Sequence, residues 1–329
     1  MKVNTDFFPL TALARRFVSQ LAQCRRLGLN VLEGSEHHVL IELPYSPALI
    51  GYPDTGVIHG GVITTLIDTA SGTAVVCAIQ EKFATLEISP TLDLRVDYMR
   101  PAEPGKPVYA FAECYRLSSN IAFTRAIAYQ DSIDEPIAHA VGSFMRISPD
   151  MVGEQFRNAL NQDGIILGPE VTELSHCPDA TSPAAPMDVK EIVRRVTELN
   201  DFGHLLEQVP YARFIGMQVE RFGDELVCRL PARDANIGNP VLPAIHGGVI
   251  AGFMEMSAIV QLMVFMQTSR VPKVVDFSID YLRAGLHKDT YAECVITRQG
   301  RRVANVNINC WQTNRKQLIA TARAHFLID

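Results

Sequence analysis

Two short stretches of the chain combine a histidine, a glycine pair and an acid at the same spacing. HGGVITTLID runs from His59 to Asp68, and HGGVIAGFME runs from His246 to Glu255. Apolar residues at helical spacing follow each glycine pair, so each stretch predicts the start of a helix. Backbone amides at a helix start can stabilise an oxyanion, and a carboxylate can act as a general base or as a nucleophile. The two stretches therefore contain groups that could attack a carbonyl carbon.

The spacing prevents each acid from serving the glycines of its own helix. Asp68 follows His59 by nine residues, which is about 13 Å along a helix and roughly half a turn around it. Gly60 and Gly247 have no side chain, so a substrate can come close to the backbone at these positions. We therefore expect two composite sites between neighbouring helices. In one, Asp68 faces Gly247, and in the other Glu255 faces Gly60.

The stretches belong to a longer internal repeat, which predicts a duplicated domain. Three further pairs of segments match in the same order: LDLRVDYMRPAEP (92–104) with VDFSIDYLRAGLH (275–287), YAFAECYRL (109–117) with TYAECVITR (290–298), and SFMRI (143–147) with HFLID (325–329). We place the first domain at 1–148, a linker at 149–186 and the second domain at 187–329. Within the linker, Asp179–Pro186 is rich in Ser, Ala and Pro, which is typical of a connection.

Each domain is expected to place one long buried helix against a mainly antiparallel sheet, an α+β layer. Both helices after the glycine pairs are apolar nearly all round, as buried helices are. An amphipathic helix opens each domain, in TALARRFVSQLAQCRRL and in VKEIVRRVTELNDFGHLLEQ. Alternating apolar residues predict strands after the first buried helix, at about 83–99, 106–117, 120–131 and 136–147.

Composition excludes several other classes of function. The net charge of −6 gives no basic face for nucleic acid. The apolar stretches after the glycine pairs are too short and too interrupted by polar residues to span a bilayer, so we expect neither a membrane span nor a membrane partner. Seven scattered cysteines without a Cys-x-x-Cys pair indicate a reducing cytoplasm. The histidines and cysteines form no metal-ligand pattern, and there is no serine-hydrolase elbow, dinucleotide-binding or phosphate-binding motif.

The pattern I-H-G-G-V-I-x-x-x-x-[D/E], followed by a strand ending in D-Y-[ML]-R, resembles the hotdog-fold acyl-CoA thioesterases, and most of all the phenylacetic-acid-pathway type. The resemblance covers about 28–147 and 216–329. It implies two hotdog domains in tandem, each a long central helix wrapped by a curved antiparallel sheet, arranged as a pseudo-dimer. It also implies hydrolysis of acyl-CoA to free acid and CoA without a cofactor. Two such chains are expected to pair as a homodimer.

The resemblance further implies that the two composite sites are unequal. The family often carries Asn-Pro before the histidine and Ser or Thr seven residues before the strand tyrosine. The site of Asp68 has both helpers, and that of Glu255 has neither. The first set comprises Asp68, Thr91, Asn239, His246 and Gly247. The second comprises Glu255, His59 and Gly60, with Tyr52 and Val274 in place of the helpers. We expect one competent and one degenerate site.

Several alternatives stay open from the sequence. The histidines could brace the loop rather than transfer protons, and either acid could be structural. Gly61 and Gly248 are further candidates for substrate binding. Arg100 and Arg283 could pair with CoA phosphates or simply solvate a strand end. A non-catalytic protein that binds an acyl or CoA ligand is the alternative function, whereas a hotdog dehydratase fits poorly because its Asp/His motif is spaced differently.

Overall fold

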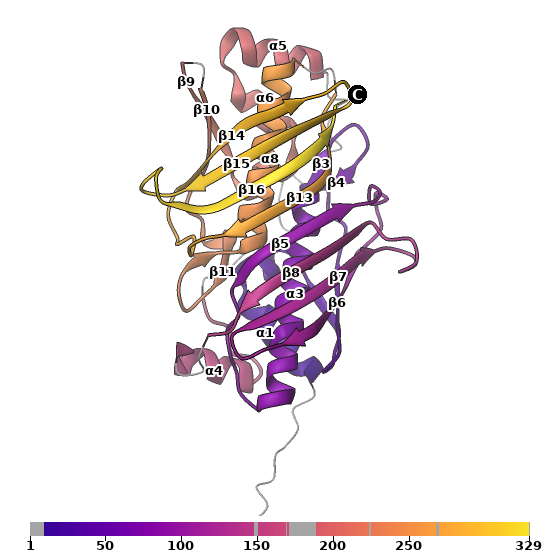
Figure 1. The fold of residues 1–329 in the computed structure, drawn as a ribbon, viewed down its shortest axis with the longest axis vertical. Coiled ribbons are helices and arrows are strands. Elements are labelled where there is room, and N and C mark those ends of the chain that lie inside the picture. The colour runs from indigo at the N-terminus through magenta and orange to yellow at the C-terminus, as the bar shows by residue number, and fades with distance from the viewer. Residues whose placement is uncertain are drawn as a thin grey trace, which may run out of the picture.

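The protein is described by a computed structural model that covers residues 10–147, 151–168, 170, 189–223, 225–267 and 270–328. Two similar modules follow one another along the chain and stack along the long axis of the molecule (Figure 1). Each module has one long helix behind a curved sheet (Figure 1). The α+β layer expected from the sequence is therefore present in both halves.

Module one contains the first half of the elements. They are α1 (Leu10–Gln20), α2 (Ala22–Leu27), β1 (Asn30–Gly34), β2 (Val39–Leu43), β3 (Ile50–Tyr52), β4 (Val57–Ile58), α3 (Gly60–Phe83), β5 (Thr91–Tyr98), β6 (Val108–Leu117), β7 (Ile121–Tyr129) and β8 (Ala138–Met145). The four strands after α3 lie where alternation predicted them. Of the connecting segment the structure describes 151–168 and residue 170, including a short helix, α4 (Glu154–Asn161), that the sequence did not predict. Asp179–Pro186 lies outside the described residues.

Module two repeats this order. Its elements are α5 (Val189–Leu199), α6 (Phe202–Gln208), α7 (Pro210–Ile215), β9 (Gln218–Phe222), β10 (Glu225–Leu230), β11 (Ile237–Asn239), β12 (Ala244–Ile245), α8 (Gly247–Met266), β13 (Lys273–Tyr281), β14 (Thr290–Gln299), β15 (Val303–Trp311) and β16 (Leu318–Leu327). The amphipathic region expected at 189–208 is divided into α5 and α6.

One continuous sheet joins the two modules. Its twelve strands run in the order β1-β2-β6-β7-β8-β5-β13-β16-β15-β14-β10-β9. The junction is the antiparallel pair β5–β13, in which Val96 lies opposite Phe277 and Leu94 opposite Ile279. All four of these side chains are buried. The junction thus continues the apolar core from one module into the next.

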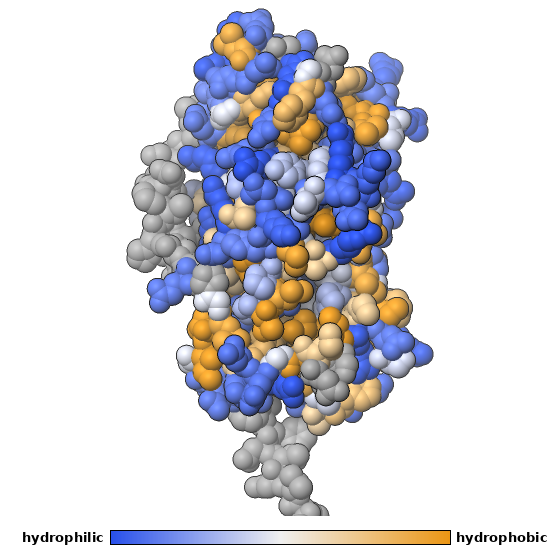
Figure 2. All heavy atoms as spheres, turned by 90° about the vertical axis from the view of Figure 1, so that its left-hand side faces the viewer, coloured by the Kyte–Doolittle hydropathy of each residue, from blue (hydrophilic) through white to orange (hydrophobic). Residues whose placement is uncertain are grey.

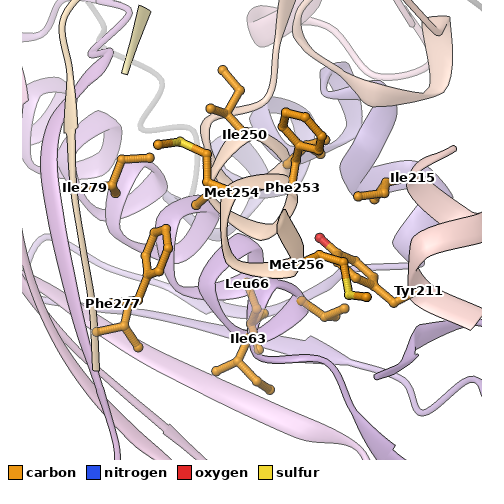
Figure 3. Packing of buried hydrophobic residues seen from close by; sticks show 14 of the residues in the cluster. Ile63, Leu66, Tyr211, Ile215, Ile250, Phe253, Met254, Met256, Phe277 and Ile279 are labelled. Carbon is orange, nitrogen blue, oxygen red and sulfur yellow. The ribbon is translucent and has the colours of Figure 1, made fainter. Parts of the chain in front are cut away.

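The long helices α3 and α8 pack against each other at very close range. An added methyl group at Gly61 would overlap the Cα of Gly252, and one at Gly248 would overlap the Cα of Thr65. Glycine is required at these contacts because any side chain would force the helices apart. Figure 3 shows the surrounding core, in which α8 residues such as Phe253 and Met254 pack between the sheet and α7.

Both long helices are strongly apolar along their length. Among the described residues, Gly60–Phe83 and Gly247–Met266 are long and apolar enough to cross a membrane. The expectation that these stretches are too short to span a bilayer is therefore wrong. Their most apolar windows are 94% and 78% buried inside the fold. The helices are apolar because they form the core between the sheet and the opposing helix.

Candidate active site

The two motif histidines cap their own helices. The Nδ1 atom of His246 accepts the amide of Gly248 at 3.0 Å, and Nδ1 of His59 accepts the amide of Gly61 at 2.9 Å. A neutral imidazole that accepts at Nδ1 carries its proton on Nε2. The Nε2 atom of His246 lies 3.2 Å from the hydroxyl oxygen of Thr69, which can accept that proton. This network holds the ring in one tautomer, and the histidine braces the helix start.

Asp68 lies across from the start of the opposite helix. Its Oδ2 is 3.5 Å from Nδ1 of His246 and would lie 3.0 Å from a Cβ placed on Gly247. Its Oδ1 accepts the hydroxyl proton of Thr91 at 2.7 Å. One carboxylate oxygen is therefore fixed by a hydrogen bond, and the other faces the space beside the Gly247 backbone. The side chain is only 6% exposed, so bulk water screens it little.

The same space opens into a pocket of about 410 Å³ between the modules. A pocket of this size can hold a small organic ligand. It is lined by all five residues of the first predicted set, which are Asp68, Thr91, Asn239, His246 and Gly247. They come from α3, β5, β11 and the start of α8. Residues far apart in the sequence thus line a single cavity.

Asn239 presents an amide group to this pocket. Its Oδ1 accepts the backbone amides of Val241 and Leu242, at 2.9 and 3.2 Å. Because both donors need an oxygen acceptor, the orientation of the side chain is determined. The NH₂ end is then the donor available to a bound carbonyl oxygen or water.

The second predicted set, which comprises Glu255, His59 and Gly60, is buried, and aromatic rings pack around it. Glu255 is 0% exposed, and its Oε2 accepts the hydroxyl of Tyr98 at 3.1 Å. Tyr211, from α7, stacks on His59 with ring centroids 4.3 Å apart, and its ring lies against α8 (Figure 3). Gly60 faces the Glu255 carboxylate directly. Acid and glycine therefore meet here as well, but Tyr211 covers the histidine.

Tyr52 and Val274 lie near this second cluster. The Tyr52 hydroxyl donates to the carbonyl of Pro272 at 3.4 Å, and Val274 packs against the core. Tyr52 is directed to a backbone carbonyl of the other module rather than to an open cavity. The positions of Asn239 and Thr91 are thus occupied here by side chains that seal the interior.

The other four candidates have packing or backbone contacts. The side faces of Gly61 and Gly248 lie in the helix–helix contact, and their amides are bound by the histidines. Neither residue lines the pocket. Arg100 donates to the carbonyl of Glu135, and Arg283 makes the equivalent bond to Leu318. Of these two, only Arg283 lines the pocket.

Known proteins share both the sequence pattern and the fold. A family model described as the thioesterase superfamily matches residues 55–137 and 242–319. A protein of Halobacterium salinarum named as an esterase is 33% identical over 135 residues, which cover 40% of this chain and 87% of that protein. The chain belongs to the thioesterase superfamily.

Two further proteins are similar to this thioesterase-superfamily chain. One is named for its activity, and the other is a solved structure that shows the fold. A medium/long-chain acyl-CoA thioesterase of Escherichia coli is 25% identical over 145 residues, which cover 41% of this chain and 92% of that protein. A solved structure from Alicyclobacillus acidocaldarius, described as having a hot dog fold, covers 95% of this chain and 97% of its own at 12% identity and a TM-score of 0.54. The expected fold of two hotdog domains is thereby confirmed.

Tyrosines are the site residues that sequence reasoning missed in this superfamily member. Tyr281 donates its hydroxyl to the carbonyl of Gly247 at 2.7 Å and lines the pocket. Tyr98 holds Glu255 on the other side. Both belong to the repeated D-Y motif, so the signal was present without an assigned role. Tyr211 carried no such signal. In the described part of the chain, no three His, Cys, Asp or Glu side chains gather to hold a metal ion.

Glu255 predicts an unusual pH dependence of stability. Burial raises the pKa of its carboxyl to about 8, and the hydrogen bond from Tyr98 offsets this only in part. Between its ordinary pKa and pH 8 the folded chain holds a proton that the unfolded chain has lost. Stability therefore falls as pH rises through this window, by roughly 1 kcal/mol per pH unit.

The test is a set of urea denaturation curves between pH 6.5 and 8. Buried His59 and His246 have lowered pKa values, so they reduce stability only below the ordinary histidine pKa of about 6.5. In this range the wild-type midpoint is expected to fall with pH, and the midpoint of Glu255→Gln to change little. Parallel curves for the two proteins would contradict a protonated Glu255.

Proposed function

We propose that the protein hydrolyses acyl-CoA thioesters to a free acid and CoA, and that turnover takes place in the pocket that contains Asp68. The observation that carries the proposal is the carboxylate of one module held beside the Gly247 backbone of the other. Membership of the thioesterase superfamily and similarity to a protein named as an acyl-CoA thioesterase support it. Arg283, at the rim of the same pocket, is the residue we assign to the CoA phosphates.

The proposed mechanism uses a water molecule and two sets of protein groups. Asp68 takes a proton from the water as it attacks the thioester carbon, and the bond from Thr91 keeps the carboxylate in place. The oxyanion that forms is stabilised by the Gly247 amide and the α8 dipole, because charge develops where these groups already point. Asn239 supplies a second donor. The tetrahedral intermediate then breaks its C–S bond and expels the CoA thiolate, which takes the proton from Asp68 and restores the carboxylate, so the reaction needs no cofactor.

Release of free thiol from a panel of acyl-CoAs, followed with a thiol reagent, tests the proposal. We expect turnover of at least some members by the wild-type chain. Binding without thiol release would favour the non-catalytic ligand-binding function. The closed cluster around Glu255 supports that alternative at the second site alone. The cytoplasmic location and the homodimer stay predictions.

Thr91→Val tests the positioning of Asp68. The substitution keeps the shape and removes the hydroxyl that donates to Oδ1. The hydrogen bond from Thr91 stabilises the charged Asp68 carboxylate in its position. Its removal is therefore expected to lower kcat about tenfold. The matched control is Val274→Thr at the equivalent position of β13, which is expected to leave kcat unchanged. A loss confined to KM in Thr91→Val would contradict a role in the chemical step.

A further inference from the structure

The described part of the connecting segment, 151–168, lies against the pocket of Asp68. Phe156 of α4 lines this pocket together with Phe17 of α1 and Leu21, which lies between α1 and α2. The rings of Phe156 and Phe17 meet edge to face, with centroids 6.5 Å apart. On its other side the segment approaches the Asn239 turn, because a Cβ placed on Gly168 would lie 3.3 Å from Pro240. The segment therefore contacts both modules.

Hydrogen bonds fix the segment to α1. Buried Arg16 donates its Nε to the carbonyl of Leu160 at 2.6 Å and pairs with Asp163 at 2.9 Å. The side chain of Gln20 donates to the carbonyl of Ile165 and accepts the amide of Leu167, both at 2.8 Å. Side-chain bonds to a loop backbone hold it in one position. The segment is therefore held in one position and forms part of the pocket lining, which we call the wall.

Apolar side chains of module one and of the connecting segment line this pocket. They are Phe17, Leu21, Ile88, Phe144, Met145 and Phe156. Figure 2 shows the side of the molecule that faces left in Figure 1, where apolar residues gather in the lower part and others lie near the upper end. An aliphatic chain would be stabilised here, whereas a charged acyl group would lose its hydration.

The distance from Asp68 to the wall limits the length of that chain. Gly72, one turn of α3 beyond Asp68, lines the pocket. Val76, one turn further, is buried in the same cluster as Phe156. The eight positions from Asp68 to Val76 span about 12 Å along the helix, which matches an extended chain of roughly eight to ten carbons.

Resting on the proposed function, we propose that the connecting segment closes the acyl end of the pocket and that Phe156 sets the chain length. The preferred substrate is then an unbranched aliphatic acyl-CoA of medium length. Phe156 acts on specificity and takes no part in the chemical step.

Phe156→Ala tests this, with Leu160→Ala as the matched control. Both side chains are almost fully buried in one cluster, but only Phe156 lines the pocket. Each methylene newly buried strengthens binding about fourfold. Phe156→Ala is therefore expected to shift the optimum by two or more carbons and to raise kcat/KM for those longer acyl-CoAs about tenfold. Leu160→Ala should lower stability and keep the wild-type optimum.

Binding separates this inference from the proposed activity. Calorimetry with non-hydrolysable acyl thioethers of CoA, from four to eighteen carbons, gives a chain-length profile even if no thiol is released. If the lowest Kd moves to longer acyl chains in Phe156→Ala, the result supports the proposal that Phe156 limits the chain length. The same optimum in both variants and the wild type, or a shift also in Leu160→Ala, would overturn it.

Discussion

Asp68→Asn is expected to lower kcat for acyl-CoA hydrolysis at least 100-fold, while Glu255→Gln stays within about threefold of the wild type. An amide has the shape of the carboxylate but cannot take a proton from water, and a positioned general base typically contributes 10²–10⁴-fold. Glu255 is fully buried, and burial raises its pKa to about 8. It is therefore largely neutral at pH 7 and a poor base.

Asp68→Asn and Glu255→Gln serve as controls for each other. Both change a buried acid on one of the paired helices, so a general loss of folding would appear in both. Circular dichroism and the denaturation midpoint establish that each variant is folded. Loss of turnover in Glu255→Gln with full activity in Asp68→Asn would reverse the assignment of the competent site.

Gly61→Ala is expected to reduce the free energy of unfolding by about 3 kcal/mol, the upper part of the range for overpacked cores. The added methyl group would overlap the Cα of Gly252 on the opposing helix. Backbone cannot move aside as a flexible side chain can, so α3 and α8 must separate. The change in the urea midpoint measures this cost.

Gly72→Ala is the matched control on the same helix. A Cβ there would lie 3.6 Å from a ring carbon of Phe144, which is an ordinary contact. Because alanine favours a helix interior by about 1 kcal/mol over glycine, this variant is expected to be as stable as the wild type or more stable. Equal midpoints for the two variants would contradict close packing at Gly61. Gly72→Ala is compared for stability alone, since Gly72 also lines the pocket.

Much of the arrangement follows from spacing that the sequence displays. Asp68 follows His59 by nine positions, or about two and a half helical turns, which places the two on opposite faces of the helix, so helical geometry favours a composite arrangement with a second helix. The structure brings Asp68 to Gly247 and Glu255 to Gly60 accordingly. The repeat similarly predicts two α+β modules, since matched segments fold alike.

Tertiary packing decided how the two halves differ. Tyr211 stacks on His59 from a helix 152 positions away in the chain, and Phe156 of α4 lines the pocket of Asp68 from the connecting segment. Neither contact has a periodic or motif signal, because it depends on which surfaces meet after folding. Local patterns report which face of an element is apolar, whereas neighbours distant in sequence decide that Asp68 lines a pocket while Glu255 is fully buried beside Tyr98.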